Sequence, residues 1–405
     1  MLKNKASSIS TEQRNVTRLR VLEHIRRKGA ISRIDIAGAL QTSPATVTTA
    51  TADLLSAGLI HEVEGDPQSG SPRRGRPRVL LKLNGGSLLI AGFKVTRHYV
   101  SVLIADFEGL ELASIKYPLI EACMTPLEFA KTIRKALESA CAAASLSMSD
   151  IAGVSIGIAG LIDAEHNFVH WSSSISERNV PLGPLLQQEV DCPVFIENDA
   201  NLVAKAEQLF GLGKGLRNFL VITIEHGVGL GIVLGGKLYR GERGCGAEFG
   251  HTKVQLDGAL CQCGQHGCLE AYVGEYALIR EASIDGQDRD QITIADLHDN
   301  AQSGDQHALS VLDRAGQIFG MGVSNLINLF DPECIIVSGS QVSFQHLYSD
   351  SVMERIRKGV VHVDAPLPDI KVNQWDDTMW AKGAIAYAIE QVSTLKIREM
   401  PTHAS

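Results

Sequence analysis

Apolar positions in the first part of the chain recur at the spacing of amphipathic helices. Residues 12–28 carry an apolar residue at every third position and predict a helix that Gly29 ends. A second helix is expected after Ser32, and a third over 44–57, where Ser43 caps the first turn and a proline follows. The positions expected to face inward are Val16, Leu19, Leu22, Ile25, Ile34, Ile36, Ala37, Leu40, Val47, Leu54 and Leu55. Two short helices joined by a tight turn predict a helix-turn-helix.

Two apolar runs after this motif predict a β-hairpin. Residues 59–63 and 79–83 have the composition of strands, and the segment between them is polar. With the three helices they predict a winged helix-turn-helix domain over 1–83. The polar segment contains Arg-Gly-Arg-Pro, in which Arg74 and Arg76 would fit a narrow, electronegative minor groove. The alternative for this segment is a flexible basic linker.

The charge distribution sets this first domain apart from the rest of the chain. Residues 1–82 hold 14 Lys and Arg against 7 Asp and Glu, whereas the remainder holds 24 against 39. A basic head indicates contact with a polyanion, although the same charge would also suit a solvated surface. Small side chains at the start of the third helix allow close approach to the major groove. The expected DNA-contacting residues are Ser43, Thr46, Thr48, Thr49, Arg74 and Arg76.

Strands and helices alternate in the rest of the chain. Apolar runs such as 88–95, 151–158 and 219–224 predict strands, and 126–144 predicts a helix, so this part belongs to the α/β class. Residues 84–405 are enough for two lobes of mixed sheet. No apolar run approaches the roughly 18 residues that cross a bilayer, and no secretory signal is visible. We therefore expect a soluble, cytoplasmic protein without a membrane partner.

One cluster of histidine and cysteine has the composition of a metal site. His251 is followed by Cys261, Cys263 and Cys268 within the segment 248–270. Three thiols and one imidazole match a closed, tetrahedral structural zinc site, because clustered cysteines in a reducing compartment are more often metal ligands than disulfides. His266 competes with His251 as the fourth ligand, and the alternative to zinc is a reduced surface loop.

Four stretches make the chain resemble the ROK family, which contains repressors and sugar kinases. They are 157–163, 197–201, 227–231 and the His/Cys cluster. With the winged helix, the resemblance is to the repressor branch. It implies a two-lobed actin-like ATPase/sugar-kinase fold after the DNA-binding domain, one structural Zn²⁺ per chain, and a sugar-binding site. The sugar-contacting residues it implies are Asn198, Asp199, Glu248, His251 and Glu270. Carboxylates and amides suit a ring of hydroxyls, because each can make several hydrogen bonds.

The sequence departs from the kinases of this family at both phosphate loops. Where they carry Gly-x-Asp-x-Gly-Gly-Thr, this chain has Lys94, Thr96 and Arg97 in place of the acid and two glycines. Where they carry Gly-Thr-Gly-x-Gly, it has Glu225 and His226. A carboxylate there repels phosphate, and the missing acid removes a magnesium ligand. Asp199, the general base of the kinases, would then be vestigial, and we expect no enzyme activity; the alternative is that Lys94 compensates near the phosphates.

The sequence therefore predicts a sugar-responsive transcriptional regulator, with repression of carbohydrate genes as the main hypothesis. Its expected partners are double-stranded operator DNA, a monosaccharide or sugar-phosphate effector, and a second copy of the chain in a homodimer or higher homo-oligomer. The rival function is a sugar kinase with an appended DNA-binding domain. Activation instead of repression is not distinguished by sequence, since the sign depends on where the operator lies.

Overall fold

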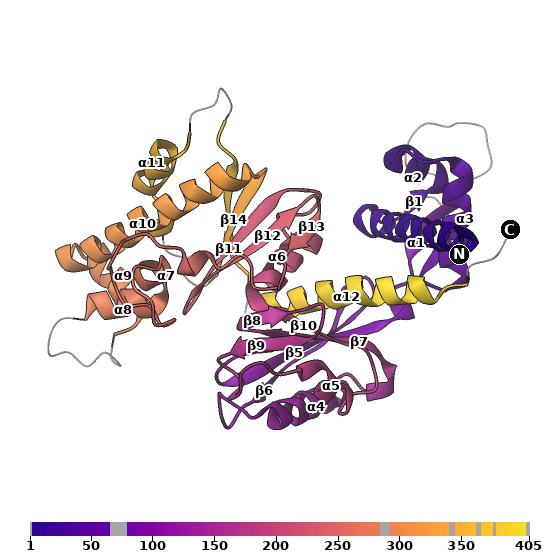
Figure 1. Cartoon of the computed structure of the whole chain (residues 1–405), viewed down its shortest axis with the longest axis horizontal. Helices are drawn as coiled ribbons and strands as arrows, with labels where there is room; N and C mark the ends of the chain where they lie inside the picture. The colour runs from indigo at the N-terminus through magenta and orange to yellow at the C-terminus, as the bar shows by residue number, and fades with distance from the viewer. Residues whose placement is uncertain are drawn as a thin grey trace. The chain divides into compact units, whose positions relative to one another are not determined.

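The computed structural model describes residues 2–64, 79–283, 292–339, 345–361, 366–375 and 378–401, with side chains from residue 11 onward. The chain forms two compact units (Figure 1). The first contains 1–160, 166–197 and 380–405, and the second contains 161–165 and 198–379. These limits differ from the predicted division at residue 83, which stays a prediction.

The first unit begins with a winged helix-turn-helix. Its antiparallel sheet has the strand order β1-β3-β2, and β2 and β3 form the predicted hairpin. Ser32 and Ser43 cap α2 and α3 by accepting hydrogen bonds from the backbone N–H groups of Asp35 and Thr46, as predicted. The elements are α1 (Leu2–Lys28), β1 (Ile31–Ser32), α2 (Arg33–Leu40), α3 (Pro44–Ser56), β2 (Ile60–Glu64) and β3 (Val79–Leu83).

Three sequence predictions for this domain are corrected by the structure. The first helix begins at Leu2, about ten residues before the apolar pattern starts, because the polar residues ahead of that pattern continue the same helix. Val16 and Ile34, expected to face inward, are 51% and 74% exposed. The small core between the helices has no room for every apolar position, and single exposed apolar residues are normal on a surface.

The first unit continues with a five-stranded sheet of order β10-β7-β4-β5-β6. Figure 1 shows α4 and the long α12 on opposite faces of this sheet. Close approach of α12 requires glycine at position 92, where a Cβ atom would lie 2.6 Å from the carbonyl oxygen of Ala381. The elements are η1 (Gly85–Ser87), β4 (Leu89–Val95), β5 (Tyr99–Asp106), β6 (Glu111–Pro118), α4 (Pro126–Ala143), η2 (Met148–Asp150), β7 (Ile151–Ile158), β9 (Phe168–Ser172), α5 (Leu182–Gln187), β10 (Val194–Asn198) and α12 (Met379–Glu399). β8 (Gly160–Asp163) belongs to the second unit from Leu161 onward.

The second unit repeats this strand order in a sheet β13-β12-β11-β14-β15. In each sheet the first three strands along the chain form an antiparallel meander. The next strand, β7 or β14, then pairs in parallel with the first strand of that meander. This duplicated α/β topology is the predicted two-lobed actin-like fold. The elements are α6 (Asp199–Leu209), β11 (Phe219–Ile224), β12 (Val228–Leu234), β13 (Lys237–Tyr239), η3 (Phe249–His251), α7 (Glu270–Val273), α8 (Glu275–Ala282), α9 (Ile294–Gln302), α10 (Gln306–Phe330), β14 (Cys334–Ser338), η6 (Gln345–Leu347), α11 (Asp350–Gly359) and β15 (Asp369–Asn373). No helix in the described ranges is long and apolar enough to cross a membrane.

Candidate functional site

The predicted zinc segment is a compact loop between η3 and α7 in the second unit. Its tip is closed by the N–H of Cys261, which donates to the carbonyl of Gln265 at 2.8 Å, and by the N–H of Gly264, which donates to the carbonyl of Cys261 at 2.9 Å. Gly267 has φ +73°, and a Cβ atom there would lie 1.7 Å from the carbonyl oxygen of Gln255. Only glycine fits at position 267, where the backbone passes close to that of Gln255 and brings the two ends of the loop together.

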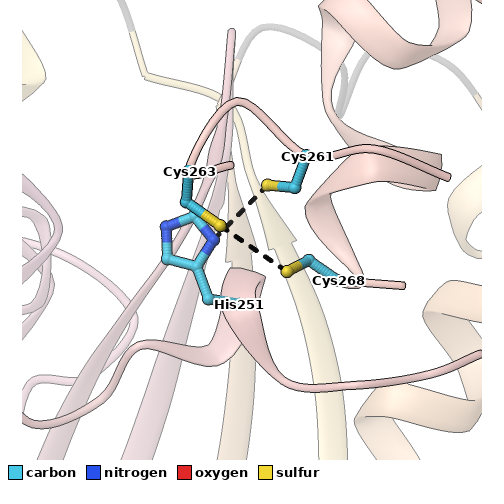
Figure 2. Close-up of side chains that lie close together, drawn as sticks. All are labelled: His251, Cys261, Cys263 and Cys268. Atoms are coloured by element: carbon cyan, nitrogen blue, oxygen red, sulfur yellow. Dashed lines mark hydrogen bonds between the residues drawn. The ribbon is translucent and has the colours of Figure 1, made fainter. Parts of the chain in front are cut away.

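The four predicted metal ligands converge in this loop (Figure 2). Their ligand atoms all lie within 4.8 Å of one another. Cys261 Sγ is 3.6 Å from His251 Nδ1, and Cys263 Sγ is 3.7 Å from Cys268 Sγ. Zinc with Zn–S bonds of about 2.3 Å and Zn–N bonds of about 2.0 Å places neighbouring ligand atoms about 3.5–3.8 Å apart in a tetrahedron. The donor set and its spacing therefore fit a Cys₃His zinc site.

The surroundings of these thiols also suit a cation. Burial raises the pKa of the Cys261 thiol, because a thiolate there has lost solvent, and a dication would compensate that loss. The competing histidine, His266, lies elsewhere: its Nδ1 is 2.9 Å from the carbonyl oxygen of Gly258. Of the two candidates, His251 is thus the one that joins the cysteines.

Three predicted sugar-contacting carboxylates, those of Asp199, Glu248 and Glu270, gather beside this cluster. Although the Glu248 side chain is 44% exposed, loss of solvent around its carboxylate raises its pKa to about 7, and the negative charges of Glu270 and Asp199 add to the shift. Glu248 Oε2 is 3.9 Å from His251 Nε2, the ring nitrogen that does not face the cysteines.

Glu270 and Asn198 are held by backbone groups. Glu270 is 8% exposed and its Oε2 accepts a hydrogen bond of 3.1 Å from the N–H of Val228. The Asn198 side-chain oxygen caps α6 by accepting from the N–H of Ala200 at 2.9 Å. The same cap fixes Asp199 at the first position of the helix. All five predicted sugar-contacting residues lie in the second unit.

Residues in the two stretches predicted to be altered phosphate loops make contacts within the protein itself. The Thr96 hydroxyl donates to the carbonyl of Tyr99 at 2.8 Å and closes the hairpin between β4 and β5. The Lys94 ammonium group lies 5.4 Å from the ring centre of Trp380. In the second loop, Glu270 occupies the backbone N–H of Val228, a donor of the kind that phosphate oxygens use.

The predicted DNA-contacting residues of the head lie at the exposed start of α3. Ser43, Thr46, Thr48 and Thr49 are all exposed, while Val47 between them is buried. The hydroxyls of Thr48 and Thr49 donate to the carbonyls of Pro44 and Ala45, so their oxygens face outward as acceptors. Arg74 and Arg76 fall outside the described residues, and their contact with DNA stays a prediction.

Comparison with known proteins assigns the family. The profile of the ROK family matches residues 91–391, and that of the MarR family, which covers the helix-turn-helix, matches 15–64. The chain belongs to the ROK family. It is 27% identical to the xylose repressor of Caldicellulosiruptor bescii over 94% of its length and 96% of that protein. It is 28% identical to the transcriptional dual regulator NagC of Escherichia coli K12, with 77% of each chain covered.

Solved structures agree with this assignment. A ROK family transcriptional regulator, described as a homolog of the E. coli Mlc protein, has a TM-score of 0.79 at 28% identity and covers 95% of this ROK chain and 99% of its own. The ROK glucokinase of Streptomyces griseus, solved with glucose and AMPPNP, has a TM-score of 0.61 at 31% identity and covers 74% and 99%. The similarity to the regulator includes the winged helix, whereas that to the kinase covers less of the chain.

Three residues at the site escaped the sequence analysis. Lys253 Nζ is 2.9 Å from Cys268 Sγ, and the Tyr276 hydroxyl is 3.5 Å from Glu270 Oε1. Gln262 lies between two predicted ligands, and its side-chain nitrogen is 3.1 Å from His226 Nε2. Lysine and tyrosine carry no signal of their own at these spacings, because the contacts depend on how the loop folds back onto α7 and α8.

Proposed function

We propose that this ROK protein is a sugar-responsive transcriptional regulator, and specifically a repressor of carbohydrate genes. The observation that carries the proposal is the joining, in one chain, of a helix-turn-helix with exposed hydroxyls on α3 to a ROK body with a carboxylate cluster beside a Cys₃His site. The similar proteins named xylose repressor and NagC support it. By analogy with them, the chain works in the cytoplasm.

The proposed effector is a monosaccharide or its phosphate, bound by Asn198, Asp199, Glu248, His251 and Glu270. Sugar hydroxyls are donors and acceptors at once, and this set offers both, because the Asn198 amide adds a donor to the acceptor oxygens of the carboxylates. The solved glucokinase complex holds glucose and supports a sugar in this fold. The similar proteins include a xylose repressor, an N-acetylglucosamine repressor and the glucokinase solved with glucose.

Zinc, held by His251, Cys261, Cys263 and Cys268, would supply a structural crosslink for the loop that carries these residues. His251 would bind it through Nδ1 and keep Nε2 for Glu248 and the sugar. The loop then holds Glu248 and Glu270 in one arrangement. The zinc ligands would then affect sugar binding by fixing the positions of Glu248 and Glu270, and His251 would also contact the sugar directly.

We propose that the protein has no kinase activity, because both stretches depart from the kinase pattern at positions that would contact phosphate and magnesium. Thr96 closes the first hairpin, Glu270 occupies the Val228 N–H in the second, and Glu225 adds negative charge there. Incubation with ATP, magnesium and each candidate sugar is expected to release no ADP above the rate of an Asp199→Asn variant. Sugar-dependent release that Asp199→Asn abolishes would favour the rival function.

Repression would work by a difference in affinity between two states. DNA binds one arrangement of the chain and sugar binds the other, so each ligand weakens the other by the same factor. A homodimer is proposed because a single winged helix contacts only a short half-site, and a symmetric pair matches a palindromic operator.

Placing a negative charge on the exposed face of α3 is expected to weaken DNA binding. Thr49→Asp should lower operator affinity at least about tenfold, since a carboxylate at the groove repels phosphate and matches no base acceptor. Fluorescence anisotropy on operator DNA measures the change. The matched control is Ser139→Asp on α4, an exposed hydroxyl with the same hydrogen bond to the carbonyl four residues earlier, at 2.9 Å. Equal affinities for both variants would contradict a DNA-contacting role for this face.

A further inference from the structure

The altered second phosphate loop contacts the zinc loop through His226. The imidazole lies 5.5 Å from the ring of Tyr276, centre to centre, at an angle of 44°. Its Nε2 is 3.1 Å from the side-chain nitrogen of Gln262. Gln262 stands between Cys261 and Cys263, so this hydrogen bond reaches the turn that carries two of the four metal ligands.

Tyr276 extends the contact to the sugar-binding residues. Its hydroxyl lies 3.6 Å from Cys261 Sγ and 3.5 Å from Glu270 Oε1, and it accepts a hydrogen bond of 3.4 Å from the backbone N–H of Gln262. The backbone also links the loop at Glu225 to the start of α8, because the N–H of Glu275 donates to the carbonyl of Glu225 at 3.2 Å. A continuous set of contacts thus runs from His226 through Tyr276 to the predicted metal ligand Cys261 and to the carboxylate of Glu270.

These contacts are not explained by core packing. His226 and Gln262 are both exposed, and Tyr276 is only half-buried. A hydrogen bond between exposed side chains adds little to overall stability. It does restrict the conformations of the turn at Cys261–Cys263, together with the backbone hydrogen bonds that close its tip.

We propose that His226 and Tyr276 are positioning residues for the zinc loop. The loop that in related kinases receives phosphate here supports the Cys261–Cys263 turn and, through Tyr276, Glu270. The zinc part of this inference stands on geometry alone, while its consequence for sugar rests on the proposed function.

The test measures the rate at which zinc leaves the full-length protein for a colorimetric chelator. His226→Ala is expected to release zinc about three- to tenfold faster, the effect of losing one hydrogen bond and one ring contact. His226→Gln, which keeps an amide that can reach Gln262, should restore most of the native rate. Tyr276→Phe should also accelerate release, and the double variant should change the rate by less than the product of the single effects.

The control is His307→Ala, which removes another exposed histidine of the same unit, with Nε2 3.0 Å from the carbonyl oxygen of Glu281. It should release zinc at the native rate. Native-rate release by His226→Ala and Tyr276→Phe, or a native protein purified without zinc, would overturn the proposal. Because zinc release needs neither DNA nor sugar, this result is independent of whether the chain proves to be a sugar-responsive regulator. If it is, His226→Ala should also raise the sugar concentration for half-release of DNA, while DNA affinity without sugar stays native.

Discussion

Replacing Cys261 with serine is expected to remove zinc from the protein and to abolish its response to sugar. Cys261 is 2% exposed, and its Sγ lies 3.6 Å from His251 Nδ1 and 3.5 Å from Glu270 Oε1. A serine hydroxyl is a poor zinc ligand, so zinc affinity should fall at least about 100-fold. Metal analysis of the purified variant, with anisotropy on operator DNA as sugar is added, measures both effects.

The head should keep its fold in this variant, because no residue of the winged helix lies in the second unit. Cys123→Ser is the matched control, since Cys123 is an exposed free thiol of the first unit and is not one of the four predicted ligands. It should retain one zinc per chain and the native sugar response. One full equivalent of zinc in Cys261→Ser would show that the cluster is not the metal site.

Removing the carboxylate of Asp53 is expected to destabilise the head by about 3–5 kcal/mol, because it leaves a buried guanidinium without its counter-charge. Arg18 is fully buried, and its guanidinium lies 2.7 Å from Asp53 Oδ2. Arg14 binds the same carboxylate at 3.0 Å, and Arg18 also donates to the carbonyl of Pro401 at 3.2 Å. Asp53 stands on α3, so Asp53→Ala loosens the helix that would contact DNA. Urea unfolding followed by the loss of DNA binding measures the effect.

The comparison is with a surface ion pair of the same domain. Arg33 and Glu62 lie 2.8 Å apart, but their side chains are 30% and 49% exposed. Glu62→Ala should cost less than about 1 kcal/mol, because solvent screens the pair. If Asp53→Ala and Glu62→Ala lowered the urea midpoint equally, the buried ion pair would not hold the head together.

Much of the fold follows from periodicity and turn residues. The helix at Pro126–Ala143 and the strand at Phe219–Ile224 match the predicted ranges closely, because their apolar patterns are long and their ends carry proline or polar residues. The beginning of α1 at Leu2 was not predicted, since residues 2–11 lack the periodic apolar positions of residues 12–28. Arg18 was also missed: a pattern of apolar positions treats arginine as surface, and only the fold supplies the carboxylate of Asp53 that permits its burial.

The site was predictable where a motif fixes a local geometry. The cysteines and His251 lie within twenty residues of one another, and this spacing of thiols and imidazole by itself indicates a metal site. The support from His226 could not be predicted, because it joins positions 36 residues apart through an exposed side chain. The same limit applies to the carboxylates of Asp199, Glu248 and Glu270. Loss of solvent, and then the nearby negative charges, raise the pKa of Glu248, and both depend on the packing of α6, η3 and α7.

The central claim, that one chain couples sugar to DNA, is tested most directly by fluorescence anisotropy of the full-length protein on the DNA upstream of its own gene. Xylose, glucose, N-acetylglucosamine and their phosphates are added in turn. The account predicts salt-sensitive binding that one of these ligands weakens at least about fivefold, the lower end of a typical allosteric coupling. DNA binding that stays unchanged with every ligand, or no DNA binding at all, would contradict it.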